Sequence, residues 1–213
     1  MFEQRKEKGD KTRMYFFMPP SVLSAFPFCI LYHILMMYRG RKAGESFKAA
    51  HFVWAYLLIL YASLVFSVTG SVTLEEAVRA VGKFPVMADI SWIPFASGLT
   101  FPTVLNLVMF LPFGFLLPVL WDRFRSFSRV LTAGFICSLV LELGQLLNFR
   151  ATDVEDLLMN TAGAAAGFLL WLLLMKLLRI KIRWKGLRSK SFLVRHEMEF
   201  LMIFAFLGHF FLS

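Results

Sequence analysis

Long apolar runs, separated by short polar segments, dominate the pattern along this chain of 213 residues. A bilayer core about 30 Å thick requires about 20 apolar residues in one helix. The pattern therefore predicts helices that cross a membrane. Five runs are long enough, and they are Tyr15–Tyr38, Ala50–Gly70, Thr103–Trp121, Ser128–Phe149 and Leu157–Leu178.

The two ends of the chain are harder to assign. The tail from Phe200 to Leu212 is apolar but short, so it is either a sixth span that starts near Glu197 or a helix that lies on the membrane; we favour the span. A basic stretch before the first run resembles a signal peptide, but Pro19 and Pro20 interrupt the apolar part, and we expect an uncleaved helix. The prediction is an all-α integral membrane protein, a bundle of five to six transmembrane helices.

Composition supports this prediction. The chain is 58% hydrophobic and 17% charged, with a mean hydropathy of +0.66. A soluble domain of this size would expose much of that apolar surface and aggregate. This excludes a soluble enzyme, a disordered chain and a nucleic-acid-binding domain, and the net charge of +9 is better explained by membrane orientation and anionic lipid.

Basic residues predict the orientation of the bundle. Segments 39–48, 122–129 and 176–195 together carry fifteen Lys and Arg, against three in segments 71–103 and 149–157. The first group should be cytoplasmic. The same alternation places the five basic residues of the N-terminus outside, so the first span either violates the rule or is a re-entrant segment broken by proline.

Polar residues within the spans gather near the predicted outer face. Glu142 and Gln145 lie three residues apart and share one face of the fourth span. An ionisable residue within a span usually faces the bundle interior or a wet cavity, next to a partner. Arg150 is the evident counter-charge, and the spacing of Asp153, Asp156 and Asn160 predicts one stripe on the fifth helix. The predicted ligand-binding pocket comprises Asn106, Glu142, Gln145, Arg150, Asp153, Asp156 and Asn160.

Structural roles compete with this interpretation. Thr152 and Glu155 match a capping box, which alone explains Glu155. Gln145 and Asn160 are also explained as interhelical hydrogen-bond partners, and a structural pair of Glu142 with Arg150 is as good an explanation as a functional one. The small residues of Gly163–Gly167 predict close helix packing, and we give them no chemical role.

No cofactor or metal site is predicted. The four histidines are scattered over different segments, and carboxylates alone are weak evidence for a cation. Cys29 and Cys137 each lie in an apolar run, which favours two buried thiols over a disulfide.

An ordered set of motifs resembles the VanZ-like family. The motifs are Asn106 with Pro112 and Gly114, then Glu142-Leu-Gly-Gln145, then Arg150-Ala-Thr-Asp153-Val-Glu-Asp156 with Asn160, preceded by Trp92-Ile-Pro94-Phe95. The resemblance implies a small helical bundle in the bacterial plasma membrane, in a family named for a protein that gives resistance to the glycopeptide teicoplanin. Carried over by motif, the family's characteristic positions are the seven pocket residues.

The resemblance divides the chain into three segments. Residues 1–49 form an N-terminal extra segment with basic flanks, 50–178 a four-helix VanZ-like core, and 179–213 a basic cytoplasmic segment followed by a hydrophobic helix.

Three functions are compatible with the pocket. The first is an envelope protein that binds a lipoglycopeptide or a lipid-linked wall precursor at the outer face, with membrane lipids and no nucleic acid as partners. A groove between the third, fourth and fifth spans would hold the acyl chain of this ligand. The second is an enzyme acting on a lipid head group, with Glu142 as general acid or base and Asp156 as the second catalytic candidate. The third is a carrier, which the absence of an internal repeat disfavours. We favour the first.

Overall fold

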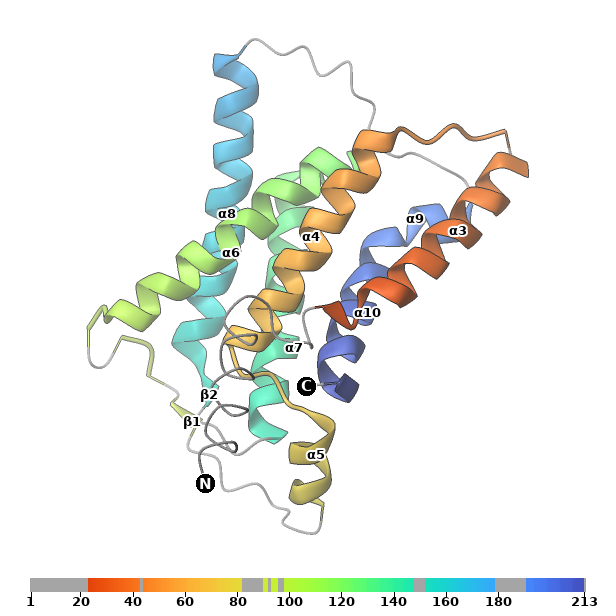
Figure 1. Cartoon of the computed structure of the whole chain (residues 1–213). Coiled ribbons are helices and arrows are strands. Elements are labelled where there is room, and N and C mark those ends of the chain that lie inside the picture. Colours follow the sequence, from red (N-terminus) through yellow and green to blue (C-terminus); the bar gives the residue numbers. More distant parts are fainter. Residues whose placement is uncertain are drawn as a thin grey trace, which may run out of the picture.

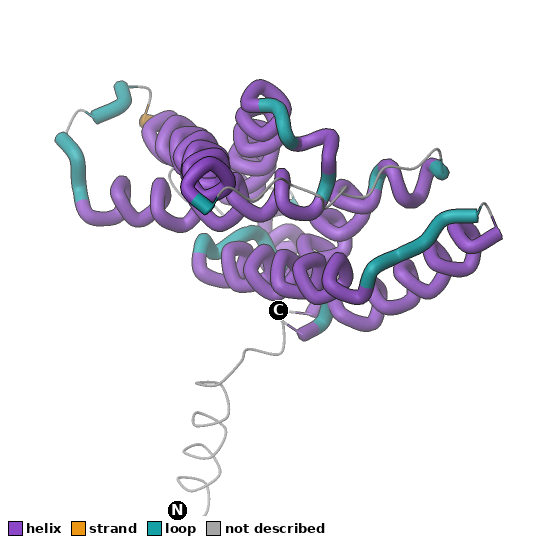
Figure 2. Tube along the Cα trace, turned by 90° about the horizontal axis from the view of Figure 1, so that it is seen from above, coloured by secondary structure: helices purple, strands orange, loops and turns teal. Residues whose placement is uncertain are grey.

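The structure is a computed structural model that describes residues 23–42, 44–81, 90–91, 93–95, 98–147, 152–178 and 191–212. Almost all of the described chain is helical (Figure 2). Its elements are α3 (Phe26–Lys42), α4 (Ala49–Val68), α5 (Leu74–Ala80), β1 (Ile90–Ser91), α6 (Phe101–Leu120), η1 (Asp122–Phe124), α7 (Phe127–Leu147), β2 (Thr152–Asp153), α8 (Val154–Leu177), α9 (Phe192–Arg195) and α10 (Glu197–Leu212).

Four of the described helices are long and apolar enough to cross a membrane. They are α4, α6, residues Phe127–Gln145 of α7, and α8. The second to fifth predicted spans coincide with these helices within a few residues, which confirms the prediction of an all-α membrane protein.

The fifth and sixth spans stay predictions. Helix α3 begins at Phe26 and has 17 residues, and the first part of the predicted span, residues 15–22, lies outside the described residues. Helix α10 begins at Glu197, where the possible sixth span was expected to start. It has only 16 residues, fewer than the roughly 20 that a span requires.

Glycine lets α6 and α8 cross at short distance (Figure 1). A Cβ atom added to Gly163 or Gly167 would overlap the backbone carbonyl oxygens of Leu107 or Leu111 on α6, and one added to Gly114 would overlap the carbonyl of Ala164 on α8. The small residues of α8 therefore allow close helix packing, as the sequence predicted. Gly114 belongs to the same contact, which the sequence pattern did not indicate.

Helix α10 packs along α4 on the other side of the bundle, and α3 contacts both α9 and α10 (Figure 1). Aromatic rings fill this second contact; those of Phe66 and Phe206, for example, lie 5.6 Å apart between centroids. At the far end of α10 the His209 ring nitrogen Nε2 lies 3.0 Å from the carbonyl oxygen of Ser71, just after α4. The C-terminal tail is thus an integral part of the bundle.

Candidate functional site

Two of the predicted pocket residues meet directly where α6 begins and α8 begins. The Asn106 side-chain amide donates a hydrogen bond to Asp156 Oδ1 at 2.5 Å, across the interface of the two helices. One turn further along α8, the buried Asn160 donates to Ser138 Oγ on α7 at 3.0 Å. Asp156 and Asn160 lie on one side of α8, as their spacing predicted, but they bond to different neighbouring helices.

The structure buries Glu142 and joins Gln145 to the end of α4. Glu142 is 4% exposed, and it lies one turn after Ser138 on α7. The Gln145 amide donates to the backbone carbonyl oxygen of Thr69, at the end of α4, at 3.1 Å. Gln145 therefore connects α7 to α4, as an interhelical hydrogen-bond partner does.

Asp153 is not on the helical stripe that its spacing predicted. It lies in β2, whose backbone pairs in parallel with β1 so that Asp153 is opposite Ser91, and α8 begins only at Val154. This backbone pairing holds Asp153 in extended conformation. The side chain of Asp153 and the whole of Arg150 lie outside the described residues, so the predicted counter-charge for Glu142 stays a prediction.

Glu155 has a larger role than the predicted helix cap. Its buried carboxylate accepts a hydrogen bond from the Thr103 hydroxyl on α6 and another, at 2.9 Å, from the backbone N–H of Phe95. Phe95 has a φ of 60°, a left-handed conformation that an aromatic residue rarely adopts without support. Glu155 thus secures the Pro-Phe turn against the start of α6 and α8.

A second polar cluster was missed by the sequence analysis, which took the histidines to be scattered. His33 on α3 and His51 on α4 both point their Nε2 atoms at the carboxylate of Glu197, at 3.0 and 2.8 Å. Trp121, the residue just after α6, donates its indole N–H to the same carboxylate at 2.8 Å. Glu197 is fully buried, at 0% exposure.

The sequence held a signal for this cluster. Glu197 opens an apolar tail, and His33 and His51 interrupt apolar runs, so each of these groups needs a buried partner. No group of three or more His, Cys, Asp or Glu in the described part of the chain is arranged to hold a metal ion.

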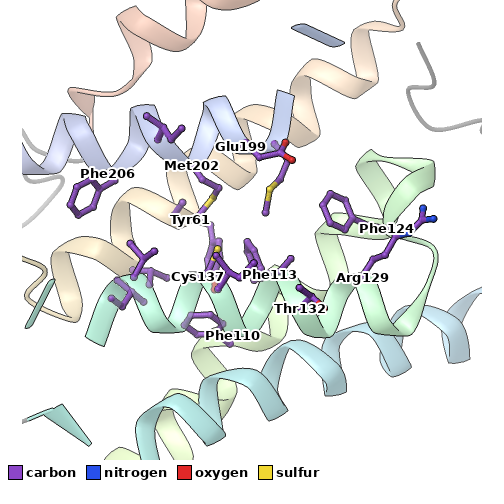
Figure 3. Close-up of a pocket in the computed structure, with 18 of the residues that line it drawn as sticks. Tyr61, Phe110, Phe113, Phe124, Arg129, Thr132, Cys137, Glu199, Met202 and Phe206 are labelled. Carbon is purple, nitrogen blue, oxygen red and sulfur yellow. The ribbon is translucent and has the colours of Figure 1, made fainter. Parts of the chain in front are cut away.

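A cavity of about 620 Å³ lies between α4, α6, α7 and α10 (Figure 3). We call it the α7–α10 cavity. Figure 3 shows Met202 and Phe206 of α10 on one side, and Cys137 of α7 with Phe113 beside it on the other. The cavity opens between α7 and α10, where the lining residues Ile136 and Ile203 are 53% and 49% exposed.

The lining is apolar over most of its length and polar at one end. Tyr61 turns its hydroxyl away to the backbone carbonyl of Met109, so the middle of the cavity presents rings and aliphatic groups. The charged and hydroxyl side chains gather where α6 ends and α7 and α10 begin; they are Arg123, Ser128, Arg129, Thr132 and Glu199.

The α7–α10 cavity differs from the groove that the sequence suggested. That groove was expected between the third, fourth and fifth spans, which are α6, α7 and α8, but α8 contributes no lining residue. The glycine contact between α6 and α8 explains this, because it brings the two helices together too closely to leave space. None of the five predicted pocket residues whose side chains the structure describes lines the cavity; these are Asn106, Glu142, Gln145, Asp156 and Asn160.

The amino-acid sequence matches a known protein family. The chain matches the VanZ/LLP1 family over residues 29–176, more than half of its length. The chain belongs to the VanZ/LLP1 family. This membership, with four membrane-length apolar helices, makes it a membrane protein of that family.

The VanZ/LLP1 match runs from within α3 to near the end of α8. It thus includes part of α3 besides the predicted core at 50–178, and the division into three segments stays a prediction. No curated protein and no solved structure matches the chain. Within the described residues, no contact favours the enzymatic alternative over binding.

Proposed function

We propose that this VanZ/LLP1 family member is a bacterial plasma-membrane protein that binds an amphiphile, with the apolar chain of the ligand in the α7–α10 cavity. The observation that carries the proposal is the cavity itself. Protein interiors are close-packed, with few voids larger than a water molecule. A volume of about 620 Å³ is instead typical of ligand sites, which run from about 300 to 1,000 Å³.

The position of the cavity supports a ligand that comes from the bilayer. Its lining follows α7 from Ser128 to Leu141, a length of about 20 Å at a rise of about 1.5 Å per residue. That is more than half of a bilayer core about 30 Å thick. Because the opening lies between two apolar helices, an acyl chain can enter sideways from the lipid, as the proposal requires.

We further propose that amphiphile binding contributes to glycopeptide resistance. Teicoplanin-type lipoglycopeptides and lipid-linked wall precursors are the amphiphiles suggested by the sequence, and an apolar chain of either would suit the lining. The seven predicted pocket residues are proposed to act at the opposite, outer end of the bundle, where Asn106 and Asp156 meet. Susceptibility to teicoplanin of a host that expresses the wild type or Asp156→Asn, at matched membrane levels, tests this part.

Partly filling the cavity should weaken amphiphile binding. We expect Ala133→Trp to lower the fraction of purified protein that retains one bound phospholipid by about tenfold, because an indole that excludes two chain methylenes removes about 0.8 kcal/mol for each. Native mass spectrometry of the full chain in mild detergent measures this fraction.

Leu139→Trp is the matched control. Leu139 is also on α7 and is exposed, but it does not line the cavity, so this variant should bind as the wild type does. Equal binding by the two tryptophan variants, or no bound lipid on the wild type, would contradict the proposed function.

A further inference from the structure

The polar end of the α7–α10 cavity is more basic than acidic. The lining holds two arginines, Arg123 and Arg129, and one carboxylate, Glu199. Arg123 forms a paired contact with Glu199 through Nη1 at 2.9 Å and Nη2 at 2.5 Å, which neutralises both side chains. The positive charge that remains at this end is that of Arg129.

Arg129 is held in place without a carboxylate. Its Nη1 donates to the backbone carbonyl oxygen of Arg123 at 2.9 Å, and among the described residues no carboxylate lies within ion-pair distance of it. A guanidinium has five N–H donors in a planar fork, so most of those of Arg129 stay available to an anion. The Nε of Arg123 is buried and makes no hydrogen bond with the described residues, which adds a donor at the same end.

The remaining groups at this end are suited to a phosphate. Ser128 and Thr132 lie one turn apart on α7 and line the same end of the cavity as Arg129. Hydroxyls and arginine together are common phosphate partners in proteins, because arginine offers two parallel N–H donors to phosphate oxygens. The neighbouring Arg125 is paired with Asp122 at 2.7 Å, so these two residues do not change the net charge at this end of the cavity.

We infer that the ligand of the α7–α10 cavity is an anionic phospholipid, with one acyl chain between α7 and α10 and its phosphate at Arg129. This inference rests on the proposed binding of an amphiphile in the cavity, and it specifies a phospholipid as that amphiphile, in place of a lipoglycopeptide or wall precursor that enters from the outer face. The phosphate end lies where α6 ends and α7 begins, the segment whose arginines predict the cytoplasmic face, so the lipid belongs to the cytoplasmic leaflet. That leaflet carries anionic lipids, which attract basic residues near the membrane surface.

The test compares two lipids that share their acyl chains. Full-length protein in mild detergent is incubated with phosphatidylglycerol, which is anionic, or phosphatidylcholine, which is zwitterionic, and the fraction with one bound lipid is measured by native mass spectrometry. We expect a preference of about fivefold or more for phosphatidylglycerol in the wild type. Arg129→Gln should remove most of this preference by lowering phosphatidylglycerol binding more than phosphatidylcholine binding, because both lipids carry the phosphate but choline offsets its charge. Arg129→Lys should retain the preference.

Arg39→Gln is the control for surface charge, because Arg39 is an exposed arginine at the end of α3 that does not line the cavity. Equal binding of the two lipids by the wild type overturns the inference and leaves the proposed function intact. An equal loss of preference in Arg39→Gln and Arg129→Gln also overturns it, because the preference then comes from overall charge. Binding of neither lipid overturns the proposed function itself.

Discussion

Glu197→Gln should destabilise the protein by about 3 kcal/mol or more. The carboxylate of Glu197 is fully buried and accepts N–H hydrogen bonds from Trp121 and from the Nε2 atoms of His33 and His51. An amide in its place has one acceptor oxygen and turns an NH₂ group towards groups that are themselves donors. A buried polar group that loses its hydrogen-bond partner lowers the stability of the folded state by its full desolvation penalty.

The measurement is the apparent melting temperature of the purified protein in detergent, for which we expect a decrease of roughly 6–12 °C in a chain of this size. Glu199→Gln is the matched control, because it makes the same chemical change two residues further along α10. Glu199 is 44% exposed and pairs with Arg123, and such pairs contribute about 1 kcal/mol or less. Similar shifts for the two variants would show that the Glu197 cluster does not hold α10 in place.

Gly163→Ala should destabilise the interface of α6 and α8 by about 1–3 kcal/mol, the usual effect of an added methyl group in a close-packed contact. Its Cβ would overlap the carbonyl oxygen of Leu107 and lie 3.0 Å from the Cβ of Phe110. Both are backbone or near-backbone atoms, which cannot rotate away as the end of a long side chain can. The two helices, which are also joined by the hydrogen bond between Asn106 and Asp156, would have to separate.

Gly144→Ala provides the control for this prediction with the same substitution in another helix. A Cβ at Gly144 would meet the Val72 Cγ1 atom at 3.7 Å, an ordinary van der Waals distance. We expect this variant to melt at the wild-type temperature or slightly above it, because alanine favours a helix more than glycine does. Thermal unfolding of both variants in the same detergent checks the pair; a loss of stability in Gly144→Ala equal to that in Gly163→Ala would refute the account of this interface.

Much of the fold could be predicted from the sequence, because a single physical requirement determines it. A helix needs about 20 apolar residues to cross the bilayer, and four helices among the described residues meet this requirement. The small residues of α8 predicted close packing for a similarly local reason, since Gly163 and Gly167 lie on the same face, one turn apart. The ends of α3 and α10 were less certain because their apolar runs are short or interrupted.

The candidate sites could be predicted only in part, because contacts between helices are not encoded in local spacing. The spacing of Asp156 and Asn160 correctly placed them on one side of a helix, but it did not say that one would bond to Asn106 and the other to Ser138. Glu197 lies 164 positions from His33 in the sequence, and no local pattern joins them. The α7–α10 cavity is lined from four helices and η1, and its existence depends on how these pack.

The most direct test of the account is to find where a lipid chain lies in the protein. Purified full-length protein is incubated with a phospholipid that carries a photoreactive diazirine in its acyl chain, irradiated and analysed by mass spectrometry of its peptides. The account predicts adducts on the cavity-lining residues Cys137 of α7 and Met202 of α10, and their loss in Ala133→Trp. Adducts confined to exposed leucines of α8, such as Leu169 and Leu173, with none in the cavity, would contradict it.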